Sequence, residues 1–293
     1  MNVQLVLSGL FSFFWGGFIT PLSIRLAQHY QIMDIPDYRK IHKAQTPRGA
    51  GLGLWAGYLL WALYTVSDDP SIRYSATGAT LVFLCGYLDD MKSLSPFVRL
   101  AVHFLAAALV VVPLGLPFPT ALICFVWITG TTSAYNLIDG VNGLCISLFI
   151  ASSIALFFVG APGFSVVMSA MALGVLCWNF PLAQTFLGDG GSTLLGFLFS
   201  AHFIIAGAPT LTRAGLLWLL LLLLLFGGIP VFDTLVAFSR RIMMGKSPFY
   251  PDRGHLHHLL VDLTGSAYYA APCLCLFQVL FLFGGISLFI RFS

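Results

Sequence analysis

Residues 216–226 read LLWLLLLLLLF, an unbroken apolar run within a longer apolar stretch over residues 214–238. A helix needs roughly 20 apolar residues to cross the hydrocarbon core of a bilayer, so this stretch predicts a transmembrane helix. The rest of the chain has the same character, since its 293 residues are 58% hydrophobic and only 9% charged. That composition excludes an ordinary soluble domain and a disordered chain, and it predicts a polytopic membrane protein.

Ten stretches of this kind occur along the chain. They cover residues 3–29, 49–66, 74–88, 96–113, 117–135, 143–160, 164–181, 191–208, 214–238 and 266–291. The predicted fold is therefore all-α, with about ten transmembrane helices in a single membrane-embedded domain over residues 1–293. The first stretch lacks a charged n-region and is longer than a signal-peptide core, so we expect it to remain as a span.

Basic residues indicate how these spans are oriented. Eleven of the fourteen Lys and Arg residues fall in connections on one side, namely Arg25, Arg39, Lys40, Lys43, Arg48, Lys92, Arg99, Arg240, Arg241, Lys246 and Arg253. Because positive charge stays inside, this side is predicted to be cytoplasmic, with both termini on the outer side of the cell inner (plasma) membrane. The net charge of +3 reflects this asymmetry, and the basic residues form no stripe suited to nucleic acid.

The acidic residues are also distributed unevenly. All eleven are Asp, and nine of them lie at or beside span ends on the predicted cytoplasmic side. A charge at mid-bilayer costs about 2.5–3.5 kcal/mol on insertion scales, so charges beside hydrocarbon tend to mark function. The polar chemistry falls in five cytoplasmic segments, residues 30–51, 88–99, 135–143, 184–193 and 239–264. The sequence thus predicts an active site that faces the cytoplasm.

The third span ends in two adjacent carboxylates, Asp89 and Asp90, within GYLDDMKSLSP. Neighbouring carboxylates repel each other, so the pair favours a site that uses a cation, a basic group or a raised pKa. The alternative is a pair of solvated acids at the end of a helix, which the helix dipole disfavours at a C-terminus.

Two further segments carry Asp beside Gly. In NLIDGVNG, Asn136 and Asp139 would cluster at a helix start, and Gly140 allows close approach of a flat or phosphorylated ligand. The alternative there is a capped Asn/Asp/Gly turn. In FLGDGGS, Asp189 lies near a predicted helix N-terminus, where the dipole favours anions, although a simple N-cap has the same pattern.

The segment GKSPFYPDRGHLHH, residues 245–258, combines three His with basic side chains that could bind phosphates or a metal. Neither an HExxH motif nor a Cys partner accompanies these His residues, and the carboxylate and amide oxygens elsewhere favour Mg²⁺ or Mn²⁺ over zinc. A basic positive-inside loop is the alternative, as it is for DIPDYRKIH and TPRGAG within residues 34–51. Asp233, at the inner end of the ninth span, is compatible with a structural role or a place in the site.

Taken together and in order, five stretches between residues 34 and 260 resemble the polyprenyl-phosphate N-acetylhexosamine-1-phosphate transferase family. They are DIPDYRKIH…TPRGAG, LDDMKSLSPFVRL, NLIDGVNGL, FLGDGGS and SPFYPDRGHLHH. Such enzymes move a sugar 1-phosphate from a UDP-sugar to a membrane polyprenyl phosphate and release UMP. The resemblance implies a Mg²⁺-dependent transferase that acts on a UDP-sugar and undecaprenyl phosphate within membrane lipid. It also implies a homodimer, because family members often form dimers.

The resemblance implies a catalytic set made of Asp89, Asp90, Asp139, Asp189 and His255. Asp189 would ligate Mg²⁺ (or Mn²⁺) bridging the donor pyrophosphate, with Asn136 close to that metal. Asp89, with Asp90, would deprotonate or position the polyprenyl phosphate. Direct in-line attack by this phosphate is favoured over a phospho-enzyme at Asp89, since phosphoryl transfer asks mainly for positioning and electrostatics.

The remaining matches imply substrate contacts. Phe186 and Gly140 would sandwich the uracil, and Asn142 would hydrogen-bond its edge, although many bacterial members have Asp there. Arg48 and Arg99 would supply positive charge for phosphate. The loop residues that would hold sugar and phosphates are Asp252, Arg253, His255, His257 and His258.

The His-rich loop also indicates the donor sugar. SPFYPDRGHLHH is similar to the loop of relatives that use UDP-GlcNAc or a similar UDP-HexNAc, whereas phospho-MurNAc-pentapeptide translocases carry a different His-rich loop. The prediction is GlcNAc-1-phosphate transfer to undecaprenyl phosphate, initiating a surface glycan such as O-antigen, with another UDP-HexNAc as the alternative. An ion-coupled transporter, the alternative from a different class, would place acids deep within spans, while here they gather at one edge.

Overall fold

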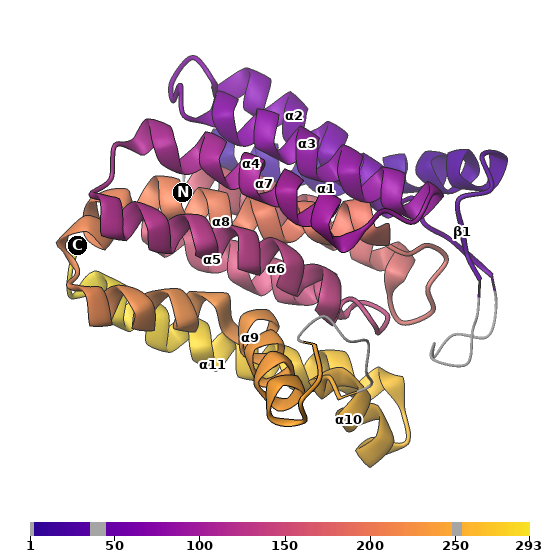
Figure 1. The fold of residues 1–293 in the computed structure, drawn as a ribbon. Coiled ribbons are helices and arrows are strands. Elements are labelled where there is room, and N and C mark those ends of the chain that lie inside the picture. Colours follow the sequence, from indigo (N-terminus) through magenta and orange to yellow (C-terminus); the bar gives the residue numbers. More distant parts are fainter. Residues whose placement is uncertain (1–2, 36–44, 248–253) are drawn as a thin grey trace.

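The computed structural model describes residues 3–35, 45–247 and 254–293, which are almost entirely helical (Figure 1). Each of the ten predicted stretches contains a helix: α1 Val3–His29, α2 Ala50–Thr65, α3 Ile72–Met91, α4 Pro96–Val111, α5 Phe118–Ile138, α6 Leu144–Ala155, α7 Pro162–Asn179, α8 Gly188–Arg213, α9 Leu216–Met243 and α11 Ala270–Ile290. Short 3-10 turns adjoin α4, α6 and α11, at η1 Val112–Leu114, η2 Leu156–Val159 and η3 Ala267–Tyr269. The predicted all-α fold is confirmed.

Seven of the helices are long and apolar enough to cross a membrane, counting α4 and α11 with their 3-10 turns. The other three are α2 and α6, which have 16 and 12 residues, and α3, which carries Arg73 and the Asp89-Asp90 pair. The polytopic membrane fold is confirmed on this ground. The number of ten spans and the side on which the termini lie stay predictions.

The helix α8 lies at the centre of the bundle, where it packs against α3 and α5 (Figure 1). Every residue from Gly190 to Ile204 is buried. Glycines bring its first turn close to two neighbours. A Cβ added to Gly86 of α3 would lie 2.6 Å from the Gly190 backbone, and one added to Gly51 of α2 would lie 2.5 Å from that of Gly191. The start of α8 is therefore held between α2 and α3.

Three features near the polar segments were not predicted. The helix α9 breaks at Gly228, whose φ of 53° and ψ of −141° are not helical, two residues before Pro230. Beyond the break it turns towards α10 (Leu256–Thr264), a short additional helix that begins at the end of the His-rich segment (Figure 1). A small antiparallel strand pair, β1 (Met33–Asp34) with β2 (Thr46–Pro47), forms within the first segment. A search for apolar runs does not detect these features, because none of them changes the mean hydropathy over a span.

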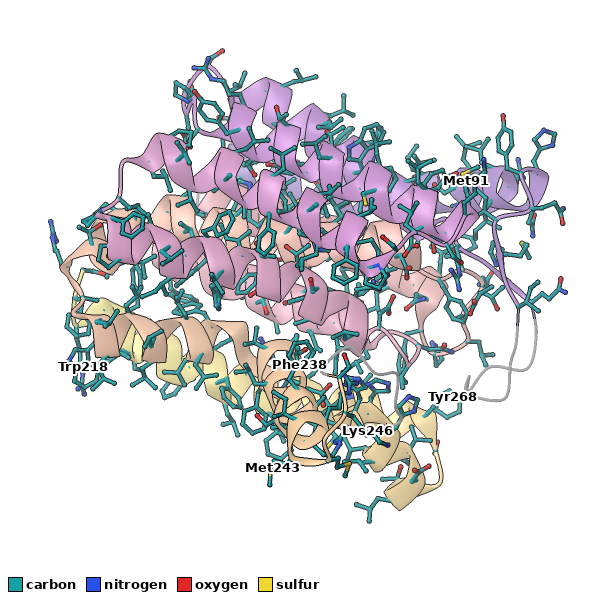
Figure 2. All side chains as sticks on the ribbon, viewed as in Figure 1. Met91, Trp218, Phe238, Met243, Lys246 and Tyr268 are labelled. Atoms are coloured by element: carbon teal, nitrogen blue, oxygen red, sulfur yellow. The ribbon has the colours of Figure 1, made fainter. Side chains whose placement is uncertain are left out.

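The polar segments gather at one end of the bundle. Figure 2 shows Met91 at the end of α3, Lys246 after α9 and Tyr268 before α11 towards this end, with Trp218 near the opposite end. Segments far apart in the sequence can therefore contribute to one site.

Candidate active site

A polar cavity of about 700 Å³ opens at this end of the molecule. Its lining combines polar, glycine and aromatic residues from four of the five predicted segments, among them Asp34, Arg48, Asn136, Asp139, Gly140, Asn142, Phe186, Asp189 and His258. The fifth segment joins through Arg99, whose Nη1 lies 3.7 Å from Oδ2 of Asp189. The structure thus brings all five segments together.

Asp90 holds the first turn of α8 in place. Its Oδ1 accepts the N–H of Asp189 at 3.0 Å and its Oδ2 accepts that of Gly190 at 3.2 Å. Gly188 has a φ of +72°, and a side chain there would overlap the Asp90 carboxylate. Only 1% of the Asp90 side chain is exposed, and this burial raises the pKa of its carboxyl group although its hydrogen bonds and Arg48 lower it. The carboxylate of Asp90 therefore acts as the cap of α8 and lies beneath the cavity.

Arg48 joins the first segment to this cap. Its Nη1 donates to Oδ1 of Asp90 at 2.8 Å, and its Nη2 pairs with Asp34. Backbone hydrogen bonds fix the position of Arg48. Its N–H donates to the carbonyl of Ile32 at 3.0 Å, and the N–H of Phe186 donates to the carbonyl of Pro47, the residue before Arg48, at 2.8 Å. Asp34 is a site residue that sequence reasoning did not assign, although it belongs to the DIPDYRKIH stretch.

Asp89 and Asp189 share one arginine on the cavity side. Asp89 accepts from Nη1 of Arg99 at 2.7 Å and from the N–H of Leu94 at 2.6 Å. Its side chain is 7% exposed, whereas that of Asp189 is 32% exposed. Asp189 is thus the more open of the two carboxylates, and it faces the cavity.

Asn136 and Asp139 lie at the end of α5, not at a helix start. Both line the cavity, and Oδ1 of Asn136 accepts from the hydroxyl of Ser192 at 3.1 Å. Burial, with a smaller contribution from Asp90, raises the pKa of Asp139 to about 7. The clustering that the sequence predicted is present, and α8 contributes to it through Ser192.

The three residues expected to hold a uracil all line the same cavity. They are Phe186, Gly140 and Asn142. Nδ2 of Asn142 donates to the carbonyl of Pro181 at 3.2 Å. Asn179, a cavity residue that sequence reasoning missed, accepts the N–H of Gly143 at 2.7 Å and donates to the carbonyl of Thr185 at 2.7 Å. No sequence signal marked it, because a single Asn at the end of a span has no distinctive pattern.

The His residues divide into two groups. Nδ1 of His255 lies 2.6 Å from Oδ2 of Asp233, and its Nε2 lies 3.3 Å from Nη2 of Arg241. All three side chains are buried, so His255 is held on both ring nitrogens. Through this contact and the N–H of Leu256, Asp233 holds the His-rich segment in place. Asp252 and Arg253, predicted in this loop, lie outside the described residues.

His257 and His258, one turn further on, are close to the cavity. His258 lines it, and His257 packs so closely on Gly140 that an added Cβ would overlap its ring. His257 is buried, and this burial, together with the neighbouring His258 and His255, lowers its pKa to about 3. A neutral His257 therefore covers the wall of the cavity formed by Gly140.

Several carboxylates gather here with two guanidinium groups. Among the described residues, Asp34, Asp89, Asp90 and Asp189 pair with Arg48 or Arg99, and Asp139 lies close to Asp90 and Arg48. Hard oxygen ligands of this kind suit a divalent cation. The described residues contain no group of three His, Cys, Asp or Glu side chains that could hold a metal by itself. A Mg²⁺ ion here would need substrate phosphates to complete its coordination.

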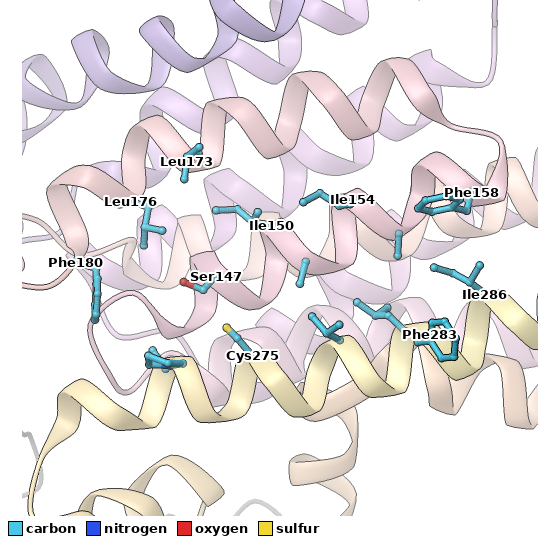
Figure 3. Close-up of a pocket in the computed structure, with 16 residues that line it drawn as sticks. Ser147, Ile150, Ile154, Phe158, Leu173, Leu176, Phe180, Cys275, Phe283 and Ile286 are labelled. Atoms are coloured by element: carbon cyan, nitrogen blue, oxygen red, sulfur yellow. The ribbon is translucent and has the colours of Figure 1, made fainter. Parts of the chain in front are cut away.

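A second hollow, an apolar groove of about 570 Å³, lies between α6, α7 and α11 (Figure 3). Phe180 marks one end of it, and Phe158 and Ile286 mark the other. Ser147 and Cys275 carry the only side-chain heteroatoms among its lining residues. None of the residues that line this groove is charged, so the groove offers no ion-pair partner for a phosphate group.

Comparison with known proteins fixes the family. A model of glycosyl transferase family 4 matches residues 72–207. A Bacillus subtilis (strain 168) protein named probable undecaprenyl-phosphate N-acetylglucosaminyl 1-phosphate transferase is 32% identical over 270 residues, covering 83% of this chain and 73% of the relative. The chain belongs to glycosyl transferase family 4. This confirms the resemblance to polyprenyl-phosphate N-acetylhexosamine-1-phosphate transferases.

Two other relatives carry names of the same kind. An undecaprenyl-phosphate alpha-N-acetylglucosaminyl 1-phosphate transferase of Thermotoga maritima is 28% identical, over 85% of this chain and 79% of its own length. A decaprenyl-phosphate N-acetylglucosaminephosphotransferase of Mycobacterium leprae is 30% identical, over 90% of this chain and 78% of its own. The region matched by the family 4 model includes Asp139 and Asp189, which line the cavity, and Asp89, which Arg99 links to Asp189.

Proposed function

We propose that this protein transfers N-acetylglucosamine 1-phosphate from UDP-GlcNAc to undecaprenyl phosphate, giving the polyprenyl-diphosphate sugar and UMP. The single observation that carries the proposal is a polar cavity at one end of a membrane bundle that is lined by Asp139 and Asp189, with Asp89 joined to Asp189 through Arg99. A soluble nucleotide-sugar and a lipid phosphate can meet only at such an edge. The names of the family 4 relatives supply the sugar and the class of acceptor.

The open carboxylate of Asp189 and the amide oxygen of Asn136 are the groups that would hold Mg²⁺, together with the donor diphosphate. When bound, the ion would neutralise charge that develops on the phosphates during transfer. Asp89 and Arg99, paired at 2.7 Å, would receive the acceptor phosphate. Arg99 would attract that phosphate, and Asp89 would accept its proton or orient it.

The reaction that fits this arrangement is direct in-line attack. An oxygen of the lipid phosphate forms a bond to the β-phosphorus of UDP-GlcNAc, and the bond from that phosphorus to the bridging oxygen breaks as UMP leaves. Asp139 and Asp189 flank the transferred group, while Asp90 and Arg48 act one step away by fixing the start of α8. The protein mainly positions two anions and balances their charge, as expected for phosphoryl transfer.

The donor nucleoside would lie on the opposite wall. Phe186 and Gly140 would stack on the uracil, Asn142 would hydrogen-bond its edge, and His257 and His258 would contact the sugar or phosphates. The positive-inside pattern supports a position of this wall on the cytoplasmic side of the inner membrane, where UDP-sugars are made.

The test is a donor comparison with purified protein in detergent and undecaprenyl phosphate. UMP release is measured with UDP-GlcNAc, UDP-GalNAc and UDP-MurNAc-pentapeptide, each with Mg²⁺ and with a chelator. We expect release with UDP-GlcNAc that stops on chelation and returns with added Mg²⁺. UMP release with another donor alone would show that the donor sugar is not GlcNAc. Release that continues in the presence of the chelator would show that the reaction needs no metal. Folded protein that is inactive with every donor would overturn the proposal.

A further inference from the structure

The break in α9 leaves a backbone group that the helix itself cannot satisfy. Gly228 has a non-helical φ of 53°, and Pro230 has no N–H to continue the ladder. The N–H of Ile229 donates instead to Oε1 of Gln278 on α11, at 2.7 Å. Breaks in spanning helices are tolerated where a neighbouring helix supplies such a partner, because water is absent at that depth. Gln278 therefore completes the broken helix.

Two further helices fix the amide of Gln278. Its Nε2 donates to the hydroxyl oxygen of Ser152 on α6 at 2.9 Å, and the hydroxyl of Tyr135 on α5 donates to the same oxygen at 3.0 Å. Gln278 is fully buried, so both ends of its amide need a partner. A side chain on Gly228 would overlap this amide. The position of the break is thus set jointly by α5, α6 and α11.

Beyond the break, α9 holds the start of α10. Asp233 accepts the N–H of Leu256 at 2.8 Å and pairs with His255, while Nη1 of Arg240 donates to the carbonyl of Gly254 at 2.6 Å. Since α10 carries His257 onto Gly140, the direction in which α9 leaves its break decides how that wall of the cavity is covered.

We propose that Gln278 is a positioning residue of this enzyme: by accepting the Ile229 N–H it fixes the break in α9, and through Asp233 and His255 it places α10 against the cavity. Gln278 lies within the apolar helix α11. Among the described residues, its side chain forms no hydrogen bond with a residue that lines the polar cavity. The kinetic part of the proposal rests on the proposed function, and the structural part does not.

The structural part is tested by amide hydrogen exchange on Gln278→Met, Gln278→Glu and Leu282→Met. Met removes the acceptor at similar size, whereas a Glu kept protonated by burial retains an acceptor and a donor. Leu282→Met is the control, a buried residue one turn along the same helix. In Gln278→Met the amides of residues 256–264 should exchange about tenfold faster, with α8 unchanged, because a buried donor loses its partner.

The proposal would be overturned if the α10 amides of Gln278→Met exchanged at the wild-type rate. It would also be overturned if Gln278→Glu and Leu282→Met accelerated this exchange as much as Gln278→Met does. If Gln278→Met fails to fold, Ser152→Ala replaces it, since this variant keeps Gln278 and removes the oxygen that accepts from its amide and from Tyr135. Faster exchange confined to α10 is again expected, and unchanged exchange in folded Ser152→Ala would overturn the proposal.

The kinetic part is tested by a double-mutant cycle between Gln278→Met and Asp233→Asn. If Gln278 acts through Asp233, Gln278→Met should raise the KM for UDP-GlcNAc roughly tenfold in the wild-type background. In the Asp233→Asn background the same substitution should change KM very little. In both backgrounds kcat should change less than KM. Additive effects would overturn the coupling. Inactive wild-type protein would refute the proposed function alone, because the exchange result would still stand.

Discussion

Asp90 and Asp189 show that the place of an aspartate in the fold decides what its carboxylate does. Asp90 is almost completely buried, and both of its carboxylate oxygens accept N–H groups from the first turn of α8. The carboxylate of Asp189, at that same turn, faces the cavity instead. A buried carboxylate with three partners stabilises structure, while an open one can bind a cation or a substrate.

Asp189→Asn should therefore reduce kcat for UMP release by about 10²–10³-fold or more while leaving the protein folded, because an amide cannot supply the same charge to a cation. The matched control is Asp262→Asn, an exposed acid on α10 outside the cavity. Both variants are compared for UMP release and apparent unfolding temperature. Activity near wild type in Asp189→Asn would refute its predicted metal-binding role.

Arg48 is a residue whose loss should affect folding more than chemistry. It pairs with Asp34 and with the buried Asp90. Arg48→Met would remove this cation from the buried carboxylate of Asp90, and breaking a buried pair typically costs about 3–5 kcal/mol. The expected result is a clear fall in the apparent unfolding temperature in detergent. Arg25→Met, at an exposed arginine on α1, is the control, and an equal fall in both variants would contradict the role of Arg48.

At the scale of elements, glycine contacts bring α3 against α8. A Cβ on Gly86 would meet the backbone of Gly190, whereas one on Gly130 of α5 would meet nothing within 4 Å. Gly86→Ala should therefore destabilise the protein by about 1–3 kcal/mol through overpacking, and Gly130→Ala should be neutral or slightly stabilising. Thermal unfolding of the two variants measures the difference. Similar behaviour of both would show that α3 and α8 are not in close contact.

The elements could be predicted to different extents from the sequence. The search for apolar stretches located all ten helices α1 to α9 and α11, because a segment that crosses hydrocarbon must be apolar. It did not detect the break at Gly228, which depends on Gln278 of a different helix, nor α10, which is too short to span. It also ended the third span at residue 88, whereas α3 runs on through Asp89 and Asp90 to Met91.

The site was predicted where its residues belong to motifs. Asp89, Asp139 and Asp189 stand in distinctive stretches, and they meet in the structure. Asn179 and Arg241 act through contacts that only the tertiary fold creates, so no local pattern could reveal them. Asp90 belongs to a motif, but its role as a cap of α8 became visible only from its partners.

At the scale of the whole molecule, the charge asymmetry predicts which end of the bundle faces the cytoplasm. Single Cys residues at Lys246 and at Thr212, after α9 and late in α8, should react oppositely with a membrane-impermeant thiol reagent in intact cells, in a background lacking the native exposed Cys177. Only the cysteine at position 212 should be labelled before permeabilisation. Labelling of position 246 alone would show that the orientation is the reverse of the predicted one and that the cavity faces the outside.

The central claim is that the sugar moves together with its phosphate. UDP-GlcNAc radiolabelled in the β-phosphate, incubated with purified protein and undecaprenyl phosphate, tests it most directly. The account predicts that the label enters the lipid product and that unlabelled UMP is released in equal amount. Label released as UDP, with an unlabelled lipid-linked sugar, would show transfer of the sugar alone and would contradict the account.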